Sequence, residues 1–150
     1  MQKIFSSCSE KETSQLASKI AKIAKKGDVF ALYGNLGVGK SVFARAFIKE
    51  LTQAEEVPSP TFTLVQEYDA SDFGIFHFDL YRLKSPDEVF EIGFEEAVYG
   101  GVSLIEWPEK AGGWLPRDVF NISVTTKGDE RIIIIEATSE EKSIRLEQIQ

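Results

Sequence analysis

The chain contains 150 residues, of which 17 are Lys or Arg, 24 are Asp or Glu, and 43% are hydrophobic. This length and composition indicate one globular domain spanning residues 1–150, and they exclude a disordered chain and a coiled coil. The net charge of −7 argues against a protein that binds nucleic acid by itself, because such affinity comes largely from Lys and Arg that neutralise phosphates.

The first predicted elements are a helix and a buried strand. Ser9 and Glu12 have the spacing of a capping box, and apolar residues then recur at helical spacing. This pattern predicts a helix over residues 9–26. The next run, 29–33, is apolar without alternation, which is typical of a strand that is covered on both faces in a parallel sheet.

A second helix and a hairpin are predicted next. Apolar residues at helical spacing indicate a helix over residues 40–51. Two prolines further along favour extended chain, since proline disfavours helical backbone in the residue before it. Strands are predicted over residues 61–68 and 75–78, and the segment 69–74 between them has the composition of a turn.

The second half of the chain predicts a further helix, a buried strand and a hairpin. Ser85 and Pro86 indicate a helix start, and residues 102–105 form another apolar strand. Residues 119–125 and 131–137 are predicted to pair as a hairpin, and the polar tail is predicted to be a loose helix. The alternation of strands and helices predicts an α/β fold: a mostly parallel central sheet flanked by helices, with an antiparallel C-terminal hairpin.

A glycine-rich segment joins the first predicted strand to the second predicted helix. Residues 34–41 fit the pattern G-x-x-x-x-G-K-[ST] at every fixed position. Glycines let backbone amides converge on a phosphate at the start of the following helix, Lys40 supplies positive charge for the β- and γ-phosphates, and Ser41 offers a hydroxyl to Mg²⁺. An ordinary glycine-rich turn does not explain this position between strand and helix. The predicted binding residues here are Gly34, Asn35, Leu36, Gly37, Val38, Gly39, Lys40, Ser41 and Val42.

Two acids, Asp79 and Glu106, follow apolar strands and are candidates for holding Mg²⁺ or orienting a water. The pattern does not say which acid has which role, and each could also be a surface carboxylate. Thr61 is either a nucleotide-sensing hydroxyl or the start of a strand. His77 is interpreted as a hydrogen-bonded structural residue rather than a base. Trp107 is expected to pack in the core, with stacking on a nucleobase as the alternative.

Missing motifs narrow the function further. No Asn-Lys-x-Asp motif is present, which excludes GTP recognition by that device, and no arginine-dense lid of a small-molecule kinase is found. Without an arginine of its own at the site, the protein would hydrolyse nucleotide slowly until a partner assists. A small-molecule kinase and a non-hydrolysing nucleotide sensor remain the alternatives.

The location of the protein is predicted from its apolar runs and its cysteine content. No run reaches the roughly 18 apolar residues of a membrane span, and the first residues lack the apolar stretch of a signal peptide. The one cysteine, Cys8, excludes an internal disulfide. We therefore expect a cytoplasmic protein without membrane contact, and a monomer when it is alone.

Four ordered blocks make the sequence similar to a known family. They are residues 34–41, 59–65 (Ser-Pro-Thr-Phe-Thr-Leu-Val), 77–83 (His-Phe-Asp-Leu-Tyr-Arg-Leu) and 106–109 (Glu-Trp-Pro-Glu). Together they resemble the bacterial TsaE family, ATPases of tRNA threonylcarbamoyladenosine biosynthesis. The resemblance implies a small P-loop protein that binds ATP and Mg²⁺ and hydrolyses ATP weakly alone. It also implies that the protein joins the TsaB–TsaD heterodimer, that hydrolysis resets this complex, and that tRNA is contacted only through the complex.

The resemblance also assigns roles to individual residues. By family analogy, Ser41 and Glu106 hold Mg²⁺ and Asp79 acts in hydrolysis together with Lys40. Thr13 matches a threonine near the nucleotide, and Arg131 matches a C-terminal arginine. Two positions of the loop depart from the family: position 35 is Asn where Asp is usual, and position 38 is Val where Ala is usual. Neither change removes a phosphate contact.

Overall fold

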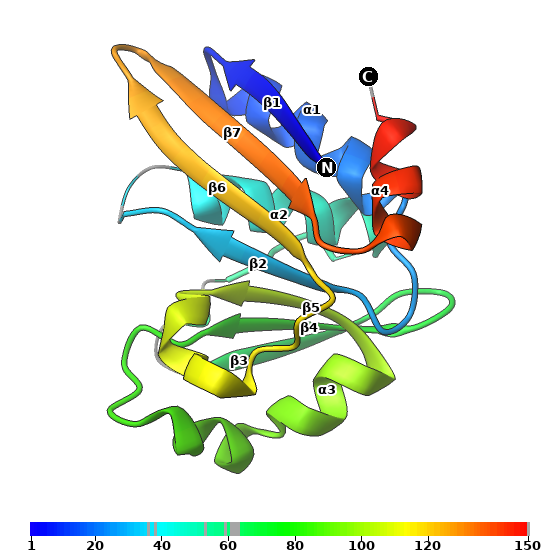
Figure 1. The fold of residues 1–150 in the computed structure, drawn as a ribbon, viewed down its shortest axis with the longest axis vertical. Coiled ribbons are helices and arrows are strands. Elements are labelled where there is room, and N and C mark those ends of the chain that lie inside the picture. Colours follow the sequence, from blue (N-terminus) through cyan, green and yellow to red (C-terminus); the bar gives the residue numbers. More distant parts are fainter. Residues whose placement is uncertain (36, 38, 53, 59, 61–63, 150) are drawn as a thin grey trace.

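The described strands of the protein form one twisted sheet with helices on both faces (Figure 1). The computed structural model describes residues 1–149 except residues 36, 38, 53, 59 and 61–63. The elements in chain order are β1 (Gln2–Ser7), α1 (Glu10–Ala21), β2 (Val29–Tyr33), α2 (Lys40–Leu51), β3 (Val65–Asp69), β4 (Gly74–Asp79), the 3-10 helix η1 (Pro86–Ile92), α3 (Phe94–Gly100), β5 (Gly101–Glu106), the 3-10 helix η2 (Pro108–Trp114), β6 (Phe120–Lys127), β7 (Glu130–Ala137) and α4 (Glu140–Glu147).

The sheet has a parallel centre and antiparallel edges. Across the described chain its order is β1-β7-β6-β2-β5-β4-β3. The neighbours β6, β2, β5 and β4 are parallel to one another, whereas β7, β1 and β3 pair antiparallel. The predicted α/β class with a parallel centre and a C-terminal hairpin is therefore confirmed. The four parallel strands end at the same edge of the sheet, which is where such sheets bind ligands.

Two apolar layers cover the central strand β2. On one face α1 and α2 contribute buried residues to a core that includes Phe30, and on the other face η1, α3 and η2 form a core that includes Val29. Phe30 is fully buried, stacks on Phe120 at 4.9 Å between ring centroids and meets the edge of Phe47. Because both faces are covered, the uninterrupted apolar run of β2 has the predicted explanation.

The N-terminal region differs from its prediction. Residues 2–7 form the edge strand β1, which pairs with β7 and which the sequence pattern does not predict. That helix does begin after Ser9, whose Oγ accepts from the Glu12 amide at 3.1 Å. It ends at Ala21 rather than at residue 26. The chain beyond the helix contacts α4, where Arg145 donates to the Ile23 carbonyl.

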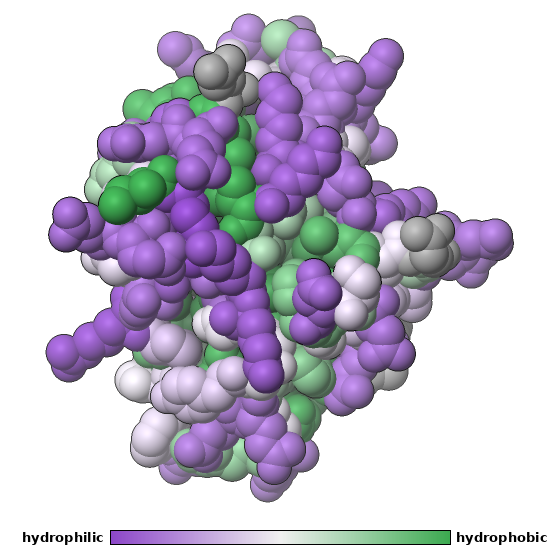
Figure 2. All heavy atoms as spheres, turned by 90° about the vertical axis from the view of Figure 1, so that its right-hand side faces the viewer, coloured by the Kyte–Doolittle hydropathy of each residue, from purple (hydrophilic) through white to green (hydrophobic). Residues whose placement is uncertain are grey.

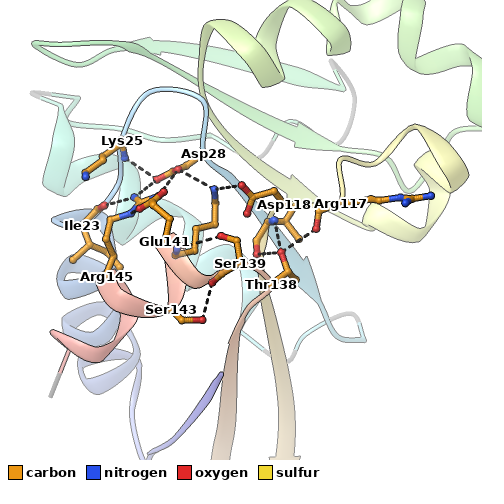
Figure 3. A network of polar contacts seen from close by, with 12 residues as sticks. Ile23, Lys25, Asp28, Arg117, Asp118, Thr138, Ser139, Glu141, Ser143 and Arg145 are labelled. Carbon is orange, nitrogen blue, oxygen red and sulfur yellow. Dashed lines mark hydrogen bonds and ion pairs between the residues drawn. The ribbon is translucent and has the colours of Figure 1, made fainter.

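Two further segments correct the predicted elements. Ser85 and Pro86 begin the 3-10 helix η1. The α-helix α3 starts only after Gly93, whose φ of 73° interrupts the helical conformation. The polar tail is the helix α4, which is anchored by buried ion pairs and is not loose (Figure 3). Of the strand predicted at residues 61–68, the part at 61–63 lies outside the described residues, and the observed strand is Val65–Asp69.

The surface on the right-hand side of Figure 1 is mainly hydrophilic. Figure 2 shows long polar side chains over most of this face, with apolar surface gathered mainly in its upper half. Among the helices that the structure describes, none combines the length and the apolarity needed to span a bilayer.

One glycine is required by close backbone approach. A Cβ atom on Gly101 would lie 2.4 Å from the Gly74 carbonyl oxygen of β4 and 2.8 Å from the ring of Phe76. We therefore expect Gly101→Ala to lower the free energy of unfolding by about 1–3 kcal/mol, because β4 and β5 must separate. Urea denaturation followed by circular dichroism measures this change.

The neighbouring glycine is a matched control for that substitution. Gly100 lies at the end of α3, and a Cβ atom there would meet nothing within 4 Å. Gly100→Ala should leave stability unchanged or raise it by up to about 1 kcal/mol, since alanine favours helix. Equal stability of the two variants would contradict the close-approach argument.

Candidate functional site

The sheet register brings the predicted acids to the same edge as the glycine-rich segment. Asp79 and Glu106 are direct neighbours at the ends of β4 and β5, and Glu106 is also paired with Leu32 of β2. One residue beyond Leu32, β2 ends at Tyr33 and the chain enters the glycine-rich segment. Glu106 is therefore one strand away from the start of this segment, and Asp79 is two strands away.

The glycines of this segment adopt backbone conformations that other residues rarely take. Gly34, Gly37 and Gly39 have φ values of 146°, 80° and 110°. No side chain caps the N-terminus of α2, which begins directly at Lys40. The first amides of this helix thus face the end of the sheet, and an anion could accept from them. The predicted contacts of Leu36 and Val38 lie outside the described residues.

A cavity of about 420 Å³ lies at this edge, and it collects most of the predicted site residues. Its lining includes the predicted residues Thr13, Gly37, Gly39, Lys40, Ser41, Val42, Glu106 and Arg131. Gly34, Asn35 and Asp79 are not part of its wall. Thr61 falls outside the described residues, so its predicted role stays a prediction.

Lys40 is the most unusual group in this cavity. The residue is 4% exposed, and its Nζ has no hydrogen-bond partner among the residues that the structure describes. The ammonium lies 4.0 Å from the ring centroid of Trp107. Burial lowers the pKa of Lys40, and the opposing effect of nearby carboxylates is led by Glu106. Burying a cation without an acceptor costs free energy, so an anion bound beside this lysine would be stabilised.

Trp107 has an unusual backbone conformation, and its ring packs against a neighbouring aromatic ring. Its φ of 58° is unusual for a bulky residue, and its ring contacts that of Tyr81 at a centroid distance of 4.9 Å. The residue is half-buried against the core that includes α3. The expected core packing is thus observed. The same ring also contacts Lys40 of the candidate site.

Glu106 is buried and oriented by a histidine. Only 5% of the residue is exposed, and its Oε2 lies 2.7 Å from Nε2 of His77, which donates to it. His77 is 2% exposed and its Nδ1 has no partner within the described chain. The interpretation of His77 as a hydrogen-bonded structural residue agrees with this contact. Because its partner is a candidate metal ligand, His77 also determines how that carboxylate points.

Asp79 has a different setting from Glu106 although the two residues are adjacent. It is 7% exposed, and its Oδ1 accepts from the Tyr81 amide at 3.1 Å. This contact fixes the turn that follows β4. Asp79 is paired with Glu106, which lines the cavity, but Asp79 itself does not line it.

Two segments of the cavity wall were not predicted. Residues 7–10, between β1 and α1, and Asp129, in the turn between β6 and β7, also line it. β6 is parallel to β2, so its end and the following turn lie beside the glycine-rich segment. Ser7 pairs with Arg131 in the neighbouring strands, and its hydroxyl is 2.7 Å from that of Thr13. The pairing of β1 with β7 and of β6 with β2 brings these residues to the cavity, and both pairings join strands that are far apart in the sequence.

The available side chains suit a cation that is bound jointly by protein oxygens and by a phosphate. In the described ranges, no group of three or more His, Cys, Asp or Glu residues could enclose a metal ion. Mg²⁺ at phosphate sites is typically bound by one or two protein oxygens together with phosphate and water. The hydroxyl of Ser41 and the carboxylate of Glu106, both in the cavity wall, match that requirement.

These features define a class of protein, and comparison with known proteins gives the family. The class is a single-domain α/β protein whose central parallel strand leads through a glycine-rich turn into a helix, beside a buried lysine and a carboxylate. Residues 7–133 match the model of the family described as "Threonylcarbamoyl adenosine biosynthesis protein TsaE". The chain belongs to the TsaE family.

Individual relatives support the same assignment. The chain is 41% identical over 137 residues to the tRNA threonylcarbamoyladenosine biosynthesis protein TsaE of Rickettsia felis, an alignment that covers 90% of this chain and 80% of that protein. The TsaE of Rickettsia conorii is 51% identical over 102 residues, which cover 67% of this chain and 58% of that protein. The TsaE of Bacillus subtilis is 38% identical over 79% of this chain and 75% of its own.

A solved structure has the same fold. The crystal structure of Bacillus subtilis YdiB superimposes with a TM-score of 0.81 at 29% sequence identity. The match covers 99% of this chain and 94% of that one. Both the sheet and its helices on either face therefore have a counterpart in an experimental structure.

Proposed function

We propose that this protein binds ATP with Mg²⁺ and hydrolyses it as an accessory subunit of the assembly that forms threonylcarbamoyladenosine in tRNA next to the anticodon. The observation that carries the proposal is the buried ammonium of Lys40 beside the glycine-rich turn, which has no hydrogen-bond partner among the described residues. Membership of the TsaE family gives the biosynthetic context. Hydrolysis is weak in the isolated protein and resets a TsaB–TsaD complex between turnovers.

Each predicted site residue has a defined task in this proposal. The amides from Gly34 to Val42 bind phosphate oxygens, and Lys40 neutralises the β- and γ-phosphates. Ser41 and Glu106 hold Mg²⁺, which supplies charge stabilisation when it is bound. Asp79 orients the attacking water, and Thr13, Thr61 and Arg131 complete the nucleotide contacts.

The remaining parts of the proposal concern partners and location. The net charge of −7 fits a subunit that contacts tRNA through TsaB–TsaD rather than directly. A monomer in the cytoplasm, without membrane contact, fits a tRNA-modifying role.

The deciding experiment measures nucleotide binding and turnover separately. Isothermal titration calorimetry with ATP and Mg²⁺ should show binding to the isolated protein. Phosphate release should be slow alone and should rise when TsaB–TsaD and tRNA are added. Tight ATP binding without turnover in the complete mixture would indicate a nucleotide sensor instead. Turnover that depends on one metabolite, with a phosphorylated product, would indicate a kinase.

The two acids at the sheet edge should separate metal binding from hydrolysis. Glu106→Gln preserves volume and the contact with His77 but removes the charge. We expect it to weaken Mg²⁺-dependent nucleotide binding by at least about tenfold and to leave Mg²⁺-free binding unchanged. Asp79→Asn, in the adjacent strand, should retain Mg²⁺-dependent binding and lose turnover.

Calorimetry with and without EDTA, combined with phosphate release, measures both effects. Equal loss of affinity in the presence and absence of Mg²⁺ would reject Glu106 as a metal ligand. Unchanged turnover in Asp79→Asn would remove Asp79 from the proposed hydrolytic step.

A further inference from the structure

The 3-10 helices and α3 lie on the other face of the sheet from α1 and α2 (Figure 1, lower part). Their residues line a second concave surface. It is a hollow of about 400 Å³ that shares no lining residue with the candidate nucleotide site. Three large side chains at this hollow are unusually exposed: Phe90 at 46%, Tyr99 at 73% and Trp114 at 50%. Aromatic side chains with this exposure are enriched at the centres of protein interfaces.

Two of these three aromatic residues, Phe90 and Trp114, are held in position although they are exposed. The Trp114 indole Nε1 donates to Oδ1 of Asp87 at 2.9 Å. Its ring meets that of Phe90 edge to face, with the centroids 4.8 Å apart at an angle of 71°. Because these rings are already ordered, binding of a partner would not incur the entropic cost of ordering them. Phe94 and Val98 of α3 form the apolar floor of the hollow.

The segment of chain that contributes η1 and α3 to the hollow is acidic. Residues 85–100 include five acidic residues and no Lys or Arg. Within the described part of the chain, Glu91, Glu95 and Glu96 have no ion-pair partner. Arg117 is the basic residue of the lining. A negative segment repels phosphates, so it disfavours nucleic acid at this surface and favours a partner that carries Lys or Arg.

We propose that this aromatic groove, which is formed by Phe90, Tyr99 and Trp114 and whose wall includes part of the acidic segment 85–100 with Glu95 in the lining, docks a basic segment of a partner protein. An apolar side chain of the partner fills the hollow. Lys or Arg side chains beside it pair with Glu95 and the other carboxylates of segment 85–100. The groove shares no lining residue with the nucleotide cavity. The identity of the partner rests on the proposed function, which makes the TsaB–TsaD heterodimer the probe to use.

The test compares groove variants with matched variants on α4, at the opposite end of the molecule. Tyr99→Ala and Glu95→Lys change the groove, and both residues are exposed, so the fold should tolerate them. Ile144→Ala and Glu140→Lys are the controls, because Ile144 is 56% exposed and Glu140 is exposed at the start of α4. Biolayer interferometry of the full chain on immobilised TsaB–TsaD, with ATP present, measures the affinity.

We expect each groove variant to weaken binding by at least about tenfold, whereas the controls stay within about twofold of the unchanged protein. The loss for Glu95→Lys should shrink at high salt, since Glu95 acts through charge. ATP affinity of the isolated chain should be the same for all four variants. A third variant, Trp114→Ala, removes the central ring and should show the largest loss.

The outcomes distinguish the groove from the function on which it rests. If the unchanged protein binds TsaB–TsaD and the groove variants bind equally well, the groove is rejected and the proposed function stands. If the unchanged protein binds ATP but not TsaB–TsaD, the partner assignment and the groove are rejected together. If the groove variants alter only self-association in sedimentation experiments, the occupant is a second copy of the chain and the proposal is overturned.

Discussion

Lys40→Ala should lower the rate of ATP turnover by at least about 100-fold while the protein stays folded. The lysine is the one charged side chain of the glycine-rich turn and helix start, and in the proposed mechanism it stabilises charge that develops on the phosphates. Its Nζ is buried and has no acceptor among the described residues. Removing it therefore relieves a desolvation cost, which offsets the lost contact with the Trp107 ring.

Stability and turnover must both be measured for this variant. We expect its free energy of unfolding to stay within about 1 kcal/mol of the unchanged protein, because the lost cation–π contact and the relieved desolvation nearly cancel. Lys49→Ala is the matched control, since Lys49 lies in the same helix but is exposed and outside the cavity. Turnover in Lys40→Ala equal to that of Lys49→Ala would refute the proposed phosphate site.

The pKa of Lys40 provides an independent sign of phosphate binding. Burial lowers this pKa in the structure. A bound triphosphate would place negative charge beside the ammonium and raise the pKa again, so nucleotide binding at an alkaline pH close to this pKa should be accompanied by proton uptake. Calorimetric titrations in buffers with different ionisation enthalpies detect such uptake, which should be absent in Lys40→Ala.

The features that the sequence predicts well are those that depend on neighbours along the chain. The buried strand β2, the glycine-rich turn and the helix α2 are consecutive, and their apolar period and their glycines are local signals. The bounds of α2 are the predicted ones, and the C-terminal hairpin is observed close to its predicted limits. The ends of β4 and β5 also place Asp79 and Glu106 side by side, as two acids at the ends of parallel strands should lie.

The features that escaped prediction depend on residues far apart in the sequence. The short strand β1 exists because β7 offers it a partner, and Asp129 reaches the cavity because β6 lies parallel to β2. The contact of His77 with Glu106 joins two strands, and neither residue signals it alone. Intrinsic propensity could not show that the polar tail forms a docked helix, because the groups that hold it come from before β2.

The largest effect on stability is expected at the anchor of that helix. Arg145 of α4 donates from Nη1 and Nη2 to both carboxylate oxygens of Asp28, at 2.6 and 2.8 Å, and Nη1 also donates to the Ile23 carbonyl (Figure 3). Arg145 is 6% exposed and Asp28 is 3% exposed. The hydrogen bonds from Arg145 to Asp28 raise the pKa of Arg145 further above its ordinary value, so the guanidinium stays charged at any pH at which the protein is folded.

Arg145→Met should lower the free energy of unfolding by about 3 kcal/mol, near the lower end of the range for breaking a buried ion pair. The loss is not larger because Lys142, whose Nζ is 3.6 Å from Asp28 Oδ1, still compensates part of the carboxylate charge. The methionine retains the apolar contact with Phe120, over whose ring the guanidinium now lies at 5.4 Å. Asp28→Asn should have a comparable effect, and the double variant should lose less than the sum of the two.

Glu141→Gln is the control, because Glu141 also pairs with Arg145 but its side chain is 59% exposed. Exposed pairs contribute little, so this variant should lose no more than about 1 kcal/mol. Hydrogen exchange should show earlier opening of α4 in Arg145→Met than in Glu141→Gln. Asp28 precedes β2, whereas the nucleotide cavity lies beyond the other end of that strand, so ATP binding should persist in Arg145→Met at temperatures where it is folded. Equal unfolding energies for Arg145→Met and Glu141→Gln would show that the anchor contributes no more than a surface ion pair.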